Sequence, residues 1–135
     1  MSYPITVIED IGAAEAEALK SVGIRTTEKL LEAAKSPKGR RLLAATTALS
    51  ERRLLHWANI ADKLRIRGMG KEYAGLLCEV GVETVKELQY RNPARLAKSM
   101  AEANKRRKLV RFLPSEKLVR RWVEHAKRLP RKITY

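Results

Sequence analysis

The sequence has 135 residues, of which 44% are hydrophobic, enough for a buried core and too many for a disordered chain. Its formal net charge is +14, and no stretch approaches the roughly 20 apolar residues of a membrane-spanning helix. The first residues lack the features of a signal peptide, and the single cysteine, Cys78, excludes an internal disulfide. We therefore expect one folded domain over residues 1–135, cytoplasmic and without membrane contact.

The positive charge is concentrated in the second half of the chain. Residues 1–62 contain 9 Lys and Arg against 8 Asp and Glu, whereas residues 63–135 contain 20 against 7. This imbalance indicates a polyanionic partner. Nucleic acid is the first candidate and an acidic protein surface is the second.

In chain order, the apolar pattern predicts helices separated by glycine and proline. Apolar residues at helical spacing follow Gly12, Gly23 stands where a helix C-cap glycine belongs, and Thr26 is placed to cap the next helix. A longer helix is predicted at 50–64, with Ser50 as its N-cap. Its predicted buried face consists of Leu54, Trp57, Ala61 and Leu64.

The second half of the chain repeats these elements. Residues 66–88 align with residues 8–30 at a constant offset of 58, with eight of 23 positions identical, and residues 115–129 align with residues 50–64. The predicted buried face of the last helix consists of Leu118, Trp122, Ala126 and Leu129. The chain therefore reads as two copies of one helical unit, approximately 1–64 and 65–135. The predicted fold class is all-α.

The way in which the two copies combine can also be predicted. Few residues precede the first repeat, so a leading helix for it has to come from elsewhere in the chain. We expect the helix at 115–129 to pack beside residues 8–22 and to close both units as one pseudo-two-fold domain. Residues 4–7 and 132–135, both rich in β-forming residues, are then expected to meet as a short terminal strand pair.

Residues 66–88 carry the clearest local motif. Gly68, Met69 and Gly70 follow an apolar residue, and the helix after them ends at Gly81. This pattern resembles the helix-hairpin-helix motif of DNA repair and recombination proteins. Nearly the whole chain resembles a bacterial family of uncharacterised proteins built on two such motifs. The resemblance implies that Gly68, Gly70 and Lys71 hold a phosphate, with Met69 buried as the anchor of the hairpin.

Elementary chemistry agrees with a phosphate site at this hairpin. Gly68 and Gly70 let the backbone approach an anion closely, and the positive end of the following helix favours negative charge. Lys71 adds a positive charge beside them. A dinucleotide fingerprint and a P-loop are excluded, because Tyr73 replaces the third glycine and Glu72 follows Lys71. No cofactor is predicted.

The first copy of the hairpin departs from the pattern. Asp10 stands at the position of Gly68, Glu9 precedes it, and Ala13 replaces Lys71. An acidic side chain at a phosphate-facing turn repels phosphate. We therefore interpret the first hairpin as structural, or as the site of a protein partner.

The remaining candidate contacts are basic side chains of the second half. They are Arg65 and Arg67 beside the hairpin, and Lys105, Arg106, Arg107 and Arg111 further along the chain. A structural interpretation stays open for both features: the glycines can serve a tight corner between helices, and the run 105–108 can be a solvated helix face.

Neither catalysis nor metal binding is predicted. His56 and His125 have no Cys or His at ligand spacing. Base-excision glycosylases that carry this hairpin use a downstream aspartate, whereas no aspartate follows Asp62. We predict a nucleic-acid-binding protein that contacts the phosphate backbone largely without sequence preference. The resemblance favours duplex or branched DNA. The alternative is a protein-interaction adaptor built on degenerate hairpins.

Overall fold

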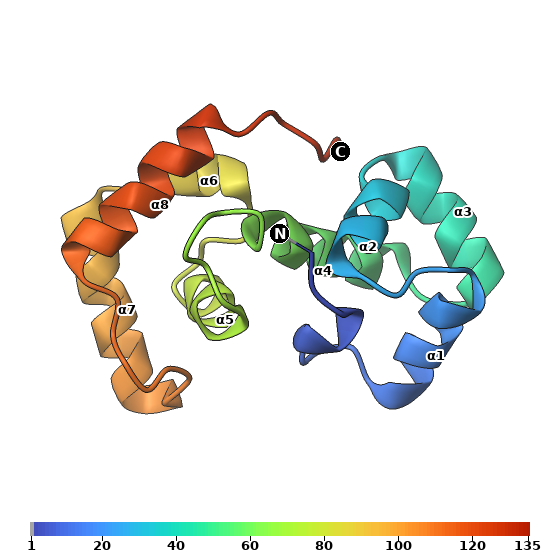
Figure 1. The fold of residues 1–135 in the computed structure, drawn as a ribbon, viewed down its shortest axis with the longest axis horizontal. Helices are drawn as coiled ribbons and strands as arrows, with labels where there is room; N and C mark the ends of the chain where they lie inside the picture. Colours follow the sequence, from blue (N-terminus) through green and yellow to red (C-terminus); the bar gives the residue numbers. More distant parts are fainter. Residues whose placement is uncertain (1) are drawn as a thin grey trace. The chain divides into compact units, whose positions relative to one another are not determined.

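The computed structural model describes residues 2–135, which form a 3-10 helix and eight α-helices, with no strand among them (Figure 1). The elements are η1 (Ile5–Val7), α1 (Ala13–Ser21), α2 (Thr27–Ala34), α3 (Pro37–Thr47), α4 (Glu51–Lys63), α5 (Lys71–Glu79), α6 (Val85–Gln89), α7 (Pro93–Arg107) and α8 (Glu116–Arg128). The predicted all-α fold class is confirmed. None of the described helices is long and apolar enough to cross a membrane.

The helices form two compact units. The first runs to Asp62 and includes Lys132–Tyr135, and the second is Lys63–Arg131. Each unit contains a turn followed directly by a helix, and each has a buried tryptophan in its last long helix, α4 or α8. We call residues 8–12 the first turn and residues 66–70 the second turn.

Helix boundaries follow the local signals of the sequence. Gly23 and Gly81 have φ values of +84° and +87°, in the left-handed region that favours glycine, directly after α1 and α5. The Thr26 hydroxyl accepts the N–H of residue 29 at 3.2 Å and caps α2. Thr84 and Glu87 form a reciprocal capping box at the start of α6. The cap predictions for Gly23, Thr26 and Gly81 are confirmed.

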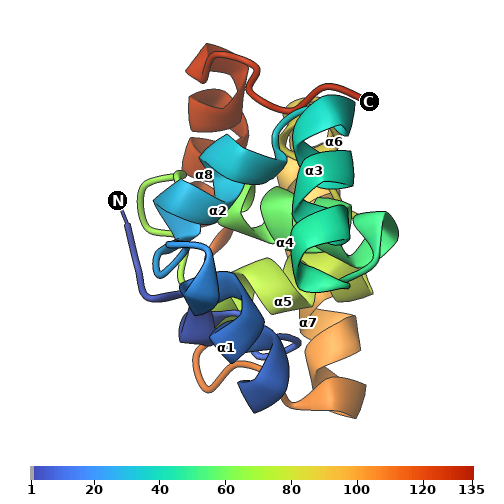
Figure 2. The same ribbon diagram turned by 90° about the vertical axis from the view of Figure 1, so that its right-hand side faces the viewer.

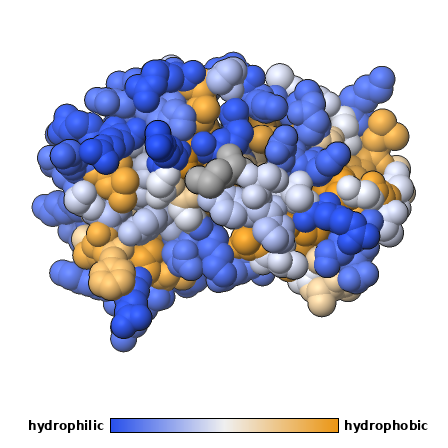
Figure 3. Space-filling view, viewed as in Figure 1, coloured by the Kyte–Doolittle hydropathy of each residue, from blue (hydrophilic) through white to orange (hydrophobic). Residues whose placement is uncertain are grey.

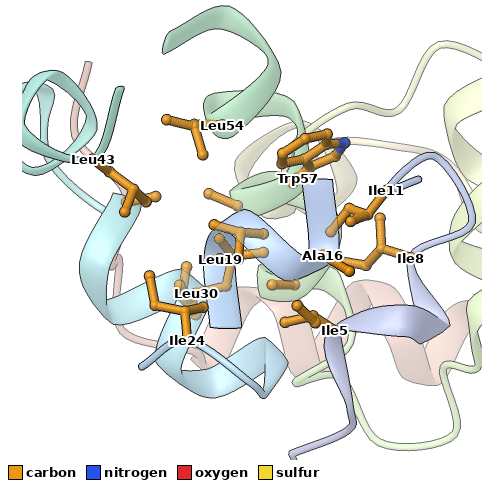
Figure 4. Close-up of a cluster of buried hydrophobic side chains, with 14 of the residues drawn as sticks. Ile5, Ile8, Ile11, Ala16, Leu19, Ile24, Leu30, Leu43, Leu54 and Trp57 are labelled. Atoms are coloured by element: carbon orange, nitrogen blue, oxygen red, sulfur yellow. The ribbon is translucent and has the colours of Figure 1, made fainter. Parts of the chain in front are cut away.

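The core of the first unit is built from α1, α2, α3, α4 and the N-terminal segment. Figure 4 shows their apolar side chains converging, with Trp57 next to Ile11 and with Leu19 and Leu30 near the centre. Trp57, Leu19 and Leu30 are fully buried. Trp57 therefore belongs to the core, as its position on the predicted apolar face of 50–64 indicated.

In the second unit, α8 packs against α6 and α7, and α5 packs against α7 (Figure 1). Trp122 is fully buried, which confirms its predicted place in the core. The predicted buried face of α8 is only partly correct, because Leu118 and Leu129 are half-buried whereas Val119 and Val123 are buried. Two neighbouring helices cover α8, so its buried stripe is wider than one line of residues at helical spacing.

The predicted partner of the first turn is wrong. The first turn is held by its own unit, since Trp57 and Arg53 of α4 both bond to Asp10. In the second unit, His125 of α8 accepts a backbone N–H of the second turn. In each unit the last long helix, α4 or α8, therefore contacts the turn of the same unit.

The predicted terminal strand pair is also wrong. Residues 5–7 form η1, and Pro4 makes an isolated bridge with Thr26. At the other end of the chain, the N–H of Thr134 donates to the carbonyl of Lys35 at 2.8 Å. Each terminal segment thus pairs with a different connection of the first unit, one before α2 and one after it.

The C-terminal segment is firmly attached to the first unit. Ile133 is buried in the core of that unit. The buried guanidinium of Arg40 donates to the carbonyls of Ala34 and Thr134 at 2.9 and 2.8 Å, and burial lowers its pKa. Both views show the C-terminal end beside α2 and α3 (Figures 1 and 2).

Candidate functional site

The second turn has buried apolar ends and an exposed glycine between them. Ile66 and Met69 are buried, and the N–H of Met69 donates to the carbonyl of Ile66 at 3.1 Å. Gly68 lies between them with a φ of +82°, a conformation that strains other residues. Gly70 then precedes α5, whose first residue is the exposed Lys71. The prediction that Met69 is buried is confirmed.

Two carboxylates, Asp10 of the first turn and Glu15 of α1, bond to donors of the first unit. The indole N–H of Trp57 donates to Asp10 Oδ2 at 3.1 Å. The backbone N–H of Gly12 donates to Glu15 Oε1 at 2.8 Å, and the guanidinium of Arg53 forms ion pairs with both carboxylates. The bond from the backbone of Gly12 is the largest cause of the lowered pKa of Glu15, followed by the bond from Arg53.

The second turn lacks both of these carboxylates. Gly68 occupies the position of Asp10, and Tyr73 occupies the position of Glu15. Trp122 is fully buried, and its Nε1 has no hydrogen-bond partner among the described residues. This nitrogen lies 3.6 Å from the place where a Cβ on Gly68 would be. In the first unit the indole N–H of Trp57 has Asp10 as its acceptor. The corresponding indole N–H of Trp122 in the second unit has no acceptor among the described residues.

The acidic residue nearest to the start of α5 is Glu72. One of its carboxylate oxygens lies 3.6 Å from the place where a Cβ on Gly70 would be. Tyr73 has no carboxylate, and its hydroxyl donates instead to the carbonyl of Phe112 at 3.0 Å. Glu72 consequently adds negative charge beside the second turn, but no bond to the backbone of Gly70 like that between Gly12 and Glu15 in the first unit is seen among the described residues.

A basic hollow of about 340 Å³ lies beside Gly68. Its lining consists of Arg67, Gly68, Leu118, Arg121, His125 and Arg128. Three arginines, from the second turn and from α8, therefore line one space. Such an arrangement attracts an anion.

His125 connects α8 to the second turn. Its Nδ1 accepts the backbone N–H of Arg67 at 3.0 Å, which requires a neutral imidazole with its proton on Nε2. Burial lowers the pKa of His125, and the nearby guanidinium groups of Arg128, Arg65 and Arg67 lower it further. The imidazole is therefore uncharged at neutral pH and serves as an acceptor.

A second hollow, of about 500 Å³, lies where Gly70 meets the connection between α7 and α8. Lys108, Arg111 and Phe112 of that connection line it together with Glu72 and Tyr73 of α5. Of the residues predicted for the site, Arg67, Gly68, Gly70 and Arg111 line one hollow or the other, and Lys71 follows Gly70 directly.

The other predicted basic residues have local roles. Lys105, Arg106 and Arg107 form the last turn of α7, where positive charge is favourable to the helix, and Arg107 pairs with Glu79 at 3.4 Å. The guanidinium of Arg65 donates to the carbonyl of Pro130 at 3.2 Å. These four residues line neither hollow.

Sequence reasoning did not include Arg121, His125 and Arg128 in the site. With Leu118 they recur at helical spacing, so a common face of α8 could have been recognised. What could not be recognised is that this face meets the second turn. Among the described residues, no group of His, Cys, Asp and Glu is arranged to hold a metal ion.

The protein is all-α, and its two turns differ. The donors at the first turn bond to the carboxylates of Asp10 and Glu15, whereas basic side chains surround the second turn. The chain belongs to the family described as Domain of unknown function (DUF4332), which matches residues 9–129. Membership of an uncharacterised family spanning most of the chain is therefore confirmed. No curated protein and no solved structure matches the chain.

Proposed function

We propose that the second unit binds the phosphate backbone of nucleic acid, most favourably duplex or branched DNA, at the second turn. The observation that carries the proposal is the difference between the two turns. The first turn supplies carboxylates to the indole of Trp57 and to the amide of Gly12. In the second turn both carboxylates are absent, and guanidinium groups gather beside Gly68 instead. A phosphate from outside is the natural counterpart of these donors.

Each part of the turn then has a definite role. The start of α5 presents backbone amides and the positive end of the helix dipole, and Gly68 keeps side-chain atoms out of the way. Arg67, Arg121 and Arg128 provide positive charge around the phosphate. The resemblance to helix-hairpin-helix motifs supports the same role. These groups contact the backbone and not the bases, so binding has little sequence preference.

The proposal is tested by the anisotropy of a fluorescent DNA duplex titrated with protein at several salt concentrations. If about 5–7 phosphates are covered, log K falls against log salt with a slope of about −5. Lys71→Glu should weaken binding to every sequence and make the slope shallower by about one. Lys98→Glu is the control, because Lys98 is equally exposed in the same unit and lines neither hollow.

A second variant tests the comparison of the two turns directly. Gly68→Asp places a carboxylate near Trp122 Nε1, as Asp10 does for Trp57, and should abolish binding. The left-handed φ of residue 68 opposes this gain in stability, so circular dichroism has to show that the variant is folded. Asp10→Gly should leave DNA affinity nearly unchanged. If Lys71→Glu and Gly68→Asp bind like Lys98→Glu, the second turn is only a corner between helices. If no DNA binds at physiological salt, the adaptor function replaces the proposal.

A further inference from the structure

The connection between α7 and α8 exposes two large apolar side chains next to the second turn. Phe112 and Leu113 are 73% and 51% exposed. Figure 3 shows hydrophobic side chains at the surface over this connection, among hydrophilic neighbours. Adjacent exposed apolar residues contribute little to a core, so their presence at the rim of the 500 Å³ hollow indicates an interaction with something outside the protein.

The connection holds these side chains in a defined place. The side-chain amide of Asn104 both donates to the carbonyl of Val110 and accepts its N–H, each at 3.0 Å. Val110 and Pro114 are buried on either side of the exposed pair. The hydroxyl of Tyr73 donates to the carbonyl of Phe112 and ties the connection to the first turn of α5. The exposure of Phe112 is thus a feature of an anchored segment.

The surroundings of Phe112 contain two basic side chains, Lys108 and Arg111, and one acidic side chain, Glu72. The guanidinium carbon of Arg111 lies 5.7 Å from the centre of the Phe112 ring. Lys108, Arg111 and Phe112 line the hollow of about 500 Å³ together with Gly70 and Glu72, so positive charge is in excess there. A ligand suited to this place has a flat apolar part for the ring and negative charge for the cations. A nucleobase attached to its phosphate has both.

We propose that Phe112 is a stacking platform for an unpaired base of the DNA strand whose phosphate is bound at the second turn, an inference that rests on the proposed function. Stacking of a base on an aromatic ring requires that the base is free of its own neighbours. The preferred substrate class is therefore DNA with unpaired nucleotides, such as a gap or a junction, and not continuous duplex. Gly70 and Phe112 line the same hollow, so phosphate and base contacts can be made together.

The experiment compares two labelled duplexes of equal length, one continuous and one with a short single-stranded gap of thymines and one 2-aminopurine. Wild-type protein should bind the gapped DNA about tenfold more tightly and change the fluorescence of the 2-aminopurine by stacking. Phe112→Ala should lose this preference and the fluorescence change, while its salt-dependent binding of the continuous duplex stays. Phe112→Trp should keep both, because a flat aromatic ring remains.

Tyr90→Ala is the matched control, since Tyr90 is 78% exposed at the end of α6 and lines neither hollow. Equal binding of both duplexes by the wild type, or a preference that survives Phe112→Ala, would overturn the stacking proposal and leave the proposed function intact. Failure to bind either duplex would overturn both. Binding of poly-glutamate that depends on Phe112 would make the platform a protein-docking site instead.

Discussion

The two buried tryptophans offer a matched pair of substitutions, Trp57→Phe and Trp122→Phe. Both side chains are fully buried, so the loss of packing is similar. Trp57→Phe also removes the bond to Asp10, and a hydrogen bond to a charged group contributes about 1.5–3 kcal/mol. Trp122→Phe removes a buried N–H without a partner, which relieves a desolvation cost of about 1–3 kcal/mol. The free energy of unfolding should therefore fall further for Trp57→Phe, by at least about 2 kcal/mol.

Urea unfolding followed by circular dichroism measures this difference, and the remaining tryptophan of each variant reports by fluorescence on the unit that was not changed. Asp10→Ala serves as the control in a double-mutant cycle: it should destabilise the wild type and have little further effect in Trp57→Phe. Equal losses for the two variants, or a larger loss for Trp122→Phe, would refute the reasoning. Such a result would mean that the indole N–H of Trp122 finds an acceptor in solution.

Three further predictions follow from individual contacts. Glu72→Gln removes the carboxylate beside Gly70 and should tighten binding of duplex DNA about two- to fivefold in the anisotropy titration; unchanged affinity would contradict the role of the second turn. The pKa of His125 is lowered from 6.5 in the folded protein, so the unfolded chain binds the proton first as pH falls, and stability is lost below about pH 6.5. His125→Asn keeps an acceptor but does not titrate, and should lose less stability in urea titrations between about pH 7.5 and pH 5.5. Arg40→Met removes two bonds to backbone carbonyls and should cost about 2–4 kcal/mol, with faster hydrogen exchange at the N–H of Thr134; slow exchange in the variant would show that Arg40 does not hold this segment.

Features with local causes were predictable from the sequence. The capping box of Thr84 and Glu87 depends on residues three positions apart, and the C-cap at Gly81 depends on one backbone angle. The burial of Trp57 and Trp122 follows from helical periodicity. The second turn was recognisable for the same reason, because its glycines and the start of α5 are continuous in the chain.

Contacts between distant residues were not predictable. Asp10 accepts from a tryptophan 47 positions later, and nothing near Asp10 in the chain indicates this partner. The same holds for His125, which reaches the backbone of residue 67 from α8. The candidate site was therefore predicted as one turn with scattered basic residues, whereas the face of α8 that completes it depends on how three helices pack. The predicted strand pair of residues 4–7 and 132–135 is absent, because the packing of these segments against the first unit outweighs their local β propensity.

The attachment of residues 132–135 to the first unit has a consequence for the order of synthesis. On the ribosome, the whole of Lys63–Arg131 is made before Ile133 and Thr134 exist. Domains generally fold as units during translation, with the N-terminal one first. In this chain the first unit cannot follow that order completely, because until residues 132–135 are made its core lacks Ile133 and the guanidinium of Arg40 lacks one of its two carbonyls. The N-terminal unit therefore cannot complete its core until the whole of the second unit has been made.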